Sequence, residues 1–270
     1  SVTPLPRGIS AAMPRFCANL SLLLTEVPLL QRFALARQAG FTAVEIQFPY
    51  NETAEAVHAA AQAAGTVITL INVPAGDLMQ GGLGLAGVPG QEAAFSAAVD
   101  TALHYAEVLG VCSVNVLAGR LAAGGCRTAA LATLAANLTA CVPRFAALGV
   151  RVGVEAINAF DMPHFLLTCW ADMEAVVTTV NHPNLFAQLD LYHLARAGDD
   201  LVGILTAPTV PISHVQFADV PRRGEPYSGT LDWAQLFGLL DQYHPALWCG
   251  AEYRPSTGCA ADSLAWLPRP

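Results

Sequence analysis

Four short apolar runs in the second half of the chain each end in a residue whose side-chain oxygen could bind a metal ion. These residues are Glu155, Asp190, Gln216 and Glu252, and each is separated from the next by about the length of one strand and one helix. If the runs are parallel strands of one barrel, their carboxyl ends meet at the same mouth and the four side chains converge there. Three carboxylates would repel one another without a cation, and an all-oxygen set favours Mg²⁺ or Mn²⁺. The pattern therefore predicts a divalent metal site.

Glu155 and Glu252 end what we predict to be the fifth and eighth strands of the barrel. These strands are far enough apart around a barrel for the two side chains to flank a small molecule. One carboxylate could remove a proton next to a carbonyl and the other could return it to the neighbouring carbon, while the metal stabilises the enediolate. We therefore predict that these two residues are the catalytic acid and base. The alternative for any single strand-end residue is a structural role, as a helix cap or as the partner of an arginine.

Two further polar residues lie close to the predicted strand ends. His193 follows Asp190 by three residues, where it could donate a hydrogen bond to a substrate oxygen. Arg223, in the loop after the seventh strand, could bind a substrate carboxylate through two hydrogen bonds, and its alternative role is a salt bridge to Glu225. Glu45 lies inside a predicted strand, and we expect it to be a structural acid that hydrogen-bonds within the barrel.

Strand and helix patterns alternate along the chain, and these elements must position the residues above. Short apolar runs predict strands at residues 16–19, 43–48, 67–73, 113–117, 151–155, 185–190, 212–216 and 247–252. Helical patterns lie at residues 26–39, 52–64, 91–109, 129–148, 171–180 and 232–243, with a weaker one at 196–207. Eight such units favour an α/β fold of the (β/α)8 TIM barrel type over an open sheet. The first strand is not followed by a glycine-rich phosphate turn, so no dinucleotide cofactor is expected.

The domain organisation predicted from the sequence is simple. No linker-like composition divides the 270 residues, so we predict a single barrel domain at residues 13–270, preceded by a flexible N-terminal extension at residues 1–12. The glycine-rich stretch at residues 76–90 follows the third strand and predicts a mobile lid loop beside the site.

The composition excludes several classes of function. The net charge is −8, and the 13 basic residues are scattered, which argues against nucleic acid and acidic membrane surfaces as partners. All 13 are arginine, so Schiff-base and lysine-anchored pyridoxal chemistry are excluded. No stretch reaches the ~20 strongly apolar residues of a membrane span. Seven cysteines without a C-x-x-C pair, and no signal-peptide pattern, predict a cytoplasmic protein.

Nine segments, in order along the chain, resemble the hydroxypyruvate isomerase family of xylose isomerase-like TIM barrels. They lie at residues 15–21, 40–50, 72–77, 88–90, 154–158, 190–193, 214–219, 223–226 and 250–253. The resemblance implies that Glu155 and Glu252 are the acid/base pair, that the four strand-end residues bind a metal, and that His193 and Arg223 lie near the substrate. Glutamine at position 216 is similar to the hydroxypyruvate isomerase branch, since the related sugar epimerases typically carry histidine there.

Two positions depart from the usual pattern of that family. Residues 80–85 are uncharged where many members carry charged side chains, and Ala156 follows Glu155 where proline is commoner. The first change removes charge from the predicted lid, so the substrate could be a relative of hydroxypyruvate. The acid/base and metal-ligand residues are unaffected.

The expected activity is that of an intramolecular aldose–ketose isomerase. It would interconvert hydroxypyruvate and 2-hydroxy-3-oxopropanoate (tartronate semialdehyde), or a close 2-oxo acid homologue, through a metal-stabilised enediolate. The alternatives are a ketose 3-epimerase or another sugar isomerase of the same superfamily, and a non-catalytic barrel that binds a small acid. Hydrolytic barrels of the endonuclease IV type need several histidine ligands and a basic DNA groove, and this acidic chain offers neither. The expected partner is a small hydroxy or keto acid, and a homo-oligomer is a further possibility.

Overall fold

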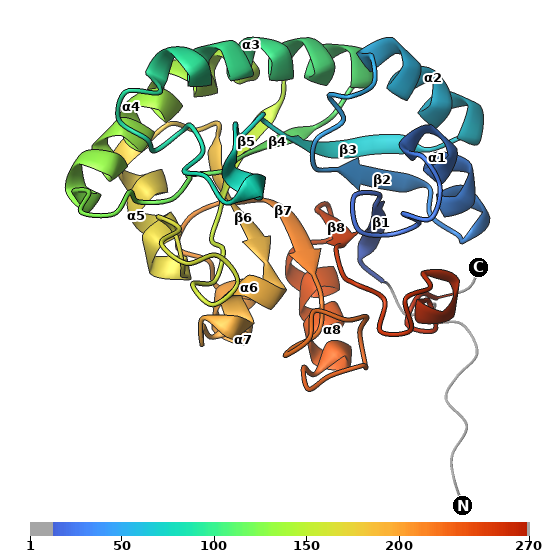
Figure 1. Cartoon of the computed structure of the whole chain (residues 1–270). Coiled ribbons are helices and arrows are strands. Elements are labelled where there is room, and N and C mark those ends of the chain that lie inside the picture. The colour runs from blue at the N-terminus through green and yellow to red at the C-terminus, as the bar shows by residue number, and fades with distance from the viewer. Residues whose placement is uncertain (1–12, 269–270) are drawn as a thin grey trace, which may run out of the picture.

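The computed structural model describes residues 13–268 as one closed barrel of eight parallel strands (Figure 1). The strands pair in chain order, and β1 closes the barrel by pairing with β8. Their bounds are β1 Arg15–Asn19, β2 Ala43–Ile46, β3 Val67–Asn72, β4 Ser113–Val116, β5 Arg151–Glu155, β6 Leu185–Asp190, β7 Ile212–Phe217 and β8 Trp248–Ala251. Every predicted strand is present, so the predicted single-domain (β/α)8 TIM barrel is confirmed. The extension predicted for residues 1–12 lies outside the described residues.

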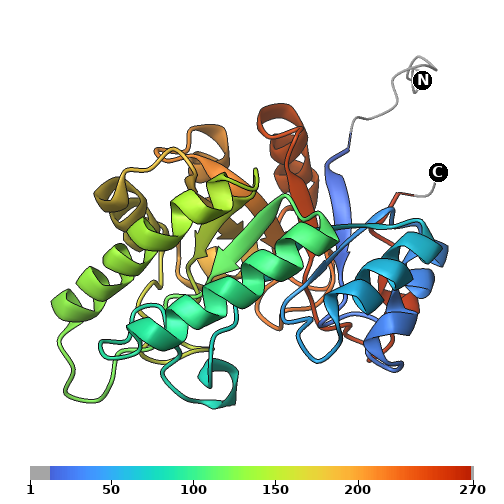
Figure 2. The same ribbon diagram turned by 90° about the horizontal axis from the view of Figure 1, so that it is seen from above.

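The helices form a ring around the strands (Figures 1 and 2). Their bounds are α1 Leu29–Gln38, α2 Ala54–Ala64, α3 Glu92–Leu109, α4 Arg127–Ala146, α5 Trp170–Val180, α6 Leu191–Arg196, α7 Leu201–Thr206 and α8 Trp233–Tyr243. Two short 3-10 helices, η1 Leu78–Gln80 and η2 Ala261–Ser263, complete the described chain. Buried apolar residues of the helices, such as Phe33, Leu134 and Leu240, belong to the same core cluster as buried apolar residues of the strands.

Two connections differ from the predicted pattern. The helix predicted at residues 196–207 is present as the shorter α7, and a further short helix, α6, which was not predicted, precedes it. Because the side chain of Asp190 caps α6, this helix begins directly after β6 and includes His193. After β8 the described chain forms no α-helix, and its last segment instead packs Trp266 against Phe16 of β1, with ring centroids 5.2 Å apart.

Local sequence explains where several elements begin and end. Thr53 and Asp232 cap α2 and α8, because the side-chain oxygen of each accepts a hydrogen bond from a backbone N–H in the first turn. Gly65 and Gly110 end α2 and α3 with φ angles of 71° and 69°. Glycine adopts this left-handed conformation without steric cost, so these two helices stop where the next strand must start.

The interior of the barrel below its mouth is polar. Glu45 of β2 is fully buried, lies 2.5 Å from His214 of β7, and accepts hydrogen bonds from Asn19 and Gln216. A methyl group added at Gly250 would collide with the Glu45 carboxylate, so β8 needs a glycine at this position. Glu45 therefore has the structural, hydrogen-bonded role that was predicted for it, directly beneath the mouth.

One helix of the described chain, α4, is long and apolar enough to cross a membrane by length and composition alone. Its buried residues include Leu134, Leu138 and Phe145, and it contacts α3, α5 and β5. Packing within the ring of the barrel therefore accounts for its apolar composition.

Candidate active site

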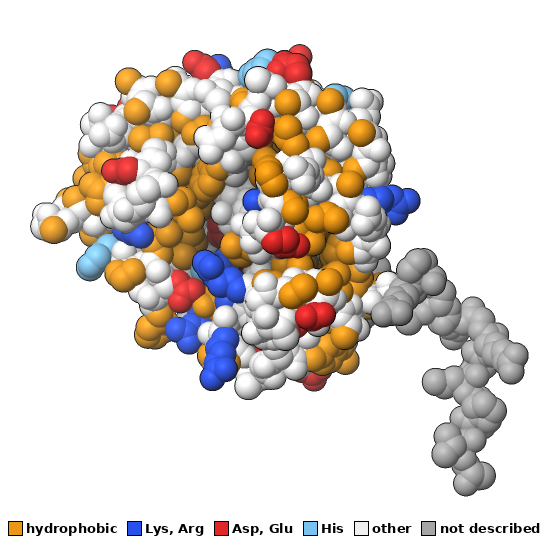
Figure 3. Space-filling view, turned by 45° about the vertical axis from the view of Figure 1, so that its right-hand side comes forward, with side chains coloured by type: hydrophobic (Ala, Val, Ile, Leu, Met, Phe, Trp, Pro, Cys, Tyr) orange, Lys and Arg blue, Asp and Glu red, His pale blue; other side chains and the backbone are white. Residues whose placement is uncertain are grey.

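The predicted site residues gather at the carboxyl ends of the strands. Glu155, Gln216 and Glu252 are at most 6 % exposed and line a cavity of about 480 Å³. His193 also lines this cavity, and one ligand atom each from Glu155, Asp190 and His193 lie within 4.8 Å of one another. Figure 3 shows a hollow in this face of the molecule, bordered by arginine and acidic side chains. The structure thus brings the strand-end residues together.

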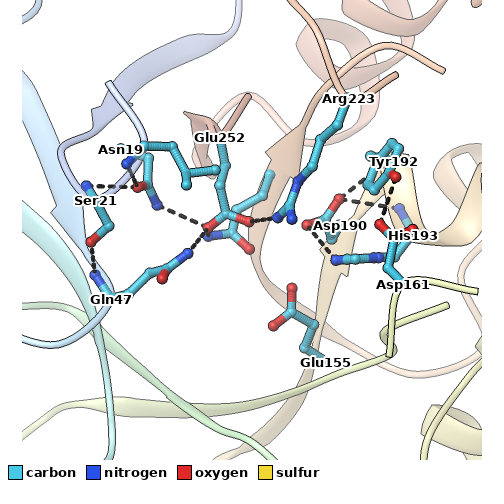
Figure 4. Close-up of polar contacts among 12 residues, drawn as sticks. Asn19, Ser21, Gln47, Glu155, Asp161, Asp190, Tyr192, His193, Arg223 and Glu252 are labelled. Carbon is cyan, nitrogen blue, oxygen red and sulfur yellow. Dashed lines mark hydrogen bonds and ion pairs between the residues drawn. The ribbon is translucent and has the colours of Figure 1, made fainter. Parts of the chain in front are cut away.

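Glu252 is held by a network of hydrogen bonds (Figure 4). Its Oε2 accepts from Asn19 Nδ2 at 2.9 Å, from Gln216 Nε2 at 2.9 Å and from Gln47 Nε2 at 3.4 Å. Its Oε1 pairs with Arg223 Nη2 at 3.0 Å. Burial raises the pKa of Glu252 well above its ordinary value and neighbouring carboxylates add to this effect, while the Arg223 charge opposes it.

Glu155 faces the same space from β5 (Figure 4). Its Oε1 accepts a hydrogen bond from Asn115 Nδ2 at 2.9 Å. Burial, and after it the negative charge of Asp190, raise the pKa of Glu155 to about 8, although Asn115 and Arg223 favour the ionised form. When two such carboxyl groups share a site, one tends to keep a proton while the other ionises. An acid/base pair requires that combination of charge states.

The two oxygens of Asp190 have different surroundings. Oδ1 accepts hydrogen bonds from the backbone N–H groups of Tyr192 and His193, at 3.0 and 3.3 Å, and so caps α6. Oδ2 is buried, lies 3.7 Å from His193 Nε2, and has no hydrogen-bond partner among the described residues. A buried carboxylate oxygen without a partner is costly, so this atom suits a bound cation or a ligand hydroxyl group.

Gln216 turns its amide nitrogen toward the acids. Its Nε2 donates to Glu45 Oε1 at 3.0 Å as well as to Glu252, and its Oε1 accepts from Gln188 Nε2 at 2.9 Å. To ligate a cation through oxygen, this amide would have to turn over and give up both hydrogen bonds to carboxylates. The ligand role of Gln216 stays a prediction that requires this rearrangement.

Arg223 pairs with Glu252 rather than with Glu225, whose carboxylate accepts a hydrogen bond from the backbone N–H of Ser256 instead. The guanidinium carbon also lies 5.2 Å from the centroid of the Tyr192 ring. Burial acts to lower the pKa of Arg223, but the surrounding carboxylates outweigh it and raise the pKa above its ordinary value. Arg223 therefore supplies a permanent positive charge inside the site.

The donor set suits a divalent cation. Glu155, Asp190 and Glu252 are buried carboxylates, and the charge of Asp190 raises the pKa of both glutamates. A cation among them would relieve this repulsion and would give Asp190 Oδ2 a partner. The carboxylates therefore fit a metal ion, with Gln216 as a further ligand only after its amide turns.

Several polar side chains of the site were not predicted from the sequence. Asn19, Gln47 and Asn115, which donate to the two glutamates, lie at or next to the ends of β1, β2 and β4. The strand-end argument, extended to the first half of the chain, would have found them. Asp161, in the loop after β5, accepts a hydrogen bond from Tyr192 Oη at 2.6 Å, and no sequence pattern marks it.

The fold and the site define a (β/α)8 barrel with paired, buried carboxyl groups at its mouth. Residues 33–269 match the family model described as "Xylose isomerase-like TIM barrel", and the chain belongs to this family. The 2-oxo-tetronate isomerase of Cupriavidus necator is 40 % identical over 255 residues, which cover 94 % of this chain and 98 % of that protein. The hydroxypyruvate isomerase of Escherichia coli is 36 % identical with the same coverage. The predicted resemblance is confirmed. Because these relatives are isomerases and match nearly the whole chain, the chain is an isomerase.

Solved structures agree on the fold. The crystal structure named AP endonuclease, family 2, from Brucella melitensis superposes with a TM-score of 0.90 at 37 % identity, covering 94 % of this chain and 98 % of that one. The structure of 3-keto-D-glucoside 4-epimerase from Escherichia coli has a TM-score of 0.78 at 20 % identity and covers 94 % and 98 %. At that identity the epimerase supports the barrel fold alone.

Proposed function

We propose that this protein isomerises a short 2-oxo acid with a hydroxyl group on C3, either hydroxypyruvate or 2-oxo-tetronate. The observation that carries the proposal is the pair of buried carboxyl groups, Glu155 and Glu252, which line one cavity and both have a raised pKa. Relatives of the chain are named for each of the two acids. Both substrates undergo the same change: a carbon-bound proton moves from C3 to C2, and the hydroxyl proton moves from O3 to O2.

The two glutamates share the proton transfer on carbon. The ionised member of the pair removes the proton from C3, which leaves an enediolate with its negative charge on the oxygens. The protonated member then delivers a proton to C2 from its own side of the substrate. The roles exchange in the reverse reaction, which fits two carboxyl groups that both have a raised pKa.

The oxygens of the substrate need positively charged or hydrogen-bonding partners. Arg223 is suited to the substrate carboxylate, and His193 is suited to O2, on which charge develops. When bound by Glu155, Asp190, Glu252 and a turned Gln216, Mg²⁺ or Mn²⁺ would supply positive charge that stabilises the enediolate oxygens. The protein groups bind and orient the substrate so that C2 and C3 lie between the two glutamates.

The cavity is compatible with both acids. They differ only by a hydroxymethyl group on C3, and about 480 Å³ is within the usual range of ligand pockets. The apolar side chains that line it are Leu22, Met79, Leu117, Ile157 and Met162. Met79 belongs to the glycine-rich loop that is predicted to be a lid, so closure of this loop would exclude water from the enediolate.

Cleavage of DNA, which the name of the Brucella melitensis structure would suggest, fits this chain poorly. The net charge is −8, whereas binding to DNA relies on basic groups that neutralise phosphates. His193 is the single histidine among the described residues that line the cavity. The cytoplasmic location and the homo-oligomer considered from the sequence remain predictions.

The test is proton NMR of hydroxypyruvate and of 2-oxo-tetronate in D2O, with Mg²⁺ or with a chelator. We expect the isomerised product with deuterium on C2. In Glu252→Gln the rate should fall by about 10²–10⁴-fold, because an amide cannot accept or deliver the proton. Glu107→Gln, an exposed change on α3, serves as the control. Unchanged turnover in Glu252→Gln would rule out this mechanism.

A further inference from the structure

The ring nitrogen Nδ1 of His193 receives two N–H donors from one residue. The side-chain Nδ2 of Asn158 lies 2.8 Å from it, and the backbone N–H of Asn158 lies 3.3 Å from it. Both residues are almost completely buried, at 1 % and 4 % exposure, so water does not compete for these contacts. A nitrogen that accepts from two donors carries no hydrogen of its own, so the ring hydrogen must lie on Nε2.

The direction of these hydrogen bonds depends on which end of the Asn158 amide faces the ring, and backbone contacts decide this. Asn158 Oδ1 accepts from the backbone N–H groups of Phe160 and Asp161, at 3.1 and 3.0 Å. If the amide were flipped, an N–H group would face each of these two donors. The side-chain nitrogen must therefore face His193, and the position of the ring hydrogen follows from the fold of the loop after β5.

Nε2 is the ring nitrogen on the active-site side. It lies 3.7 Å from Asp190 Oδ2, and His193 lines the cavity. An Nε2 that carries hydrogen can donate to an oxygen atom but has no lone pair for a metal ion. His193 is close enough to Glu155 and Asp190 to complete a three-residue metal cluster, yet this tautomer cannot act as a ligand there.

We propose that Asn158 is a positioning residue that holds His193 as the Nε2–H tautomer, so that His193 donates a hydrogen bond to substrate O2 and does not ligate the metal. The identity of the oxygen rests on the proposed function, whereas the tautomer follows from the protein contacts alone. Loss of one donor to a developing oxyanion typically slows a reaction by about 10²–10³-fold.

The tautomer can be read directly from long-range ¹H–¹⁵N NMR spectra of the whole protein with ¹⁵N-labelled histidine. The His193 signals are assigned by their loss in His193→Gln. We expect Nδ1 without hydrogen and Nε2 with hydrogen, both before and after Mg²⁺ is added. In Asn158→Asp, one carboxylate oxygen keeps the bonds to Phe160 and Asp161 while the other can only accept, so Nδ1 must gain a hydrogen.

Asn184→Asp is the matched control. Asn184 is partly buried and its side chain donates to the backbone carbonyl of Val150 at 2.8 Å, at the opposite end of the strands. The same chemical change there should leave the His193 signals as they are in the unmodified chain. In Asn158→Asp, kcat should fall by about 10²-fold with a smaller change in KM, since the lost hydrogen bond matters most in the transition state.

Two results would overturn the inference: hydrogen on Nδ1 in the unmodified chain, or Nδ1 still without hydrogen in Asn158→Asp. If Asn158→Asp fails to fold, the spectrum of the unmodified chain decides alone. If the chain turns over neither acid but has hydrogen only on Nε2, the proposed function fails and the assignment of the tautomer is supported.

Discussion

The two halves of the barrel mouth carry different chemistry. The polar residues at the ends of β1–β4 are neutral amides, and those at the ends of β5–β8 are three carboxylates and one amide. The first set is Asn19, Gln47, Asn72 and Asn115, and the second is Glu155, Asp190, Gln216 and Glu252. Three amides of the first set donate hydrogen bonds to glutamates of the second. One half therefore positions the acids that the other half supplies.

Neutral donors suit this task better than cations would. A further lysine or arginine beside each glutamate would add to the effect of Arg223 and lower the pKa more strongly, whereas an amide orients the carboxylate and offsets burial only in part. Asn19 illustrates how firmly such a donor is held. Its Oδ1 accepts from the backbone N–H groups of Ser21 and Leu22, so its Nδ2 must face Glu45 and Glu252.

The largest effect should come from the acidic half, in Asp190→Asn. Asparagine can still cap α6, so the fold should persist, but the carboxylate oxygen offered to the site is lost. We expect kcat/KM to fall by about 10³-fold. We also expect Mg²⁺ to raise the melting temperature of the unmodified chain but not that of this variant. Turnover by NMR and thermal unfolding with and without Mg²⁺ measure both effects.

Asp200→Asn is the control for that change. Asp200 caps α7 through the backbone N–H of Gly203 and is exposed, so the variant should behave as the unmodified chain. If Asp190→Asn were stabilised by Mg²⁺ as strongly as the unmodified chain, the metal would not be held by Asp190.

A smaller effect is expected in the amide half, in Asn19→Asp. The new carboxylate replaces a donor by an acceptor that faces Glu45 and Glu252. We expect kcat to fall by about 10²-fold and the free energy of unfolding to fall by about 2–4 kcal/mol at neutral pH, because a further buried charge lacks a partner. Steady-state kinetics and urea unfolding measure these changes. Asn51→Asp adds the same charge at an exposed position and should change neither quantity. An Asn19→Asp variant with unchanged kcat and unchanged stability would contradict a positioning role for the amide half.

Much of this arrangement could be predicted because its pattern is local. Every strand has its own apolar run, and Glu155, Asp190 and Glu252 stand out because a charged residue ends or directly follows such a run. The short helix α6 was missed, since its six residues directly follow β6 and are too few to show a helical period.

Contacts made by loops could not be predicted in the same way. The role of Asn158 depends on the return of the loop after β5 to α6, which brings it to a histidine 35 positions later in the chain. The partner of Arg223 is likewise Glu252, 29 positions away, rather than the nearby Glu225. Such contacts depend on tertiary packing, which strand and helix periodicity does not encode.

The smallest expected change in stability is that of Glu155→Gln, which places a neutral amide, as found in the amide half, in the acidic half. Burial and the charge of Asp190 raise the pKa of Glu155 from 4.5 to about 8 in the folded chain. The folded state thus binds this proton more tightly than the unfolded state, so the associated stability is complete below about pH 4.5 and is lost as the pH rises through about 8. Glutamine can still accept from Asn115 but does not titrate.

With a chelator present, we expect Glu155→Gln to exceed the unmodified chain in free energy of unfolding by about 2 kcal/mol at pH 8.5, and by much less at pH 5. Urea unfolding at both pH values measures this, with the exposed Glu107→Gln as a control that should follow the unmodified chain. A Glu155→Gln variant that is less stable at pH 8.5 would mean that the ionised carboxylate is stabilised by its surroundings, and the acidic half would then be as well compensated as the amide half.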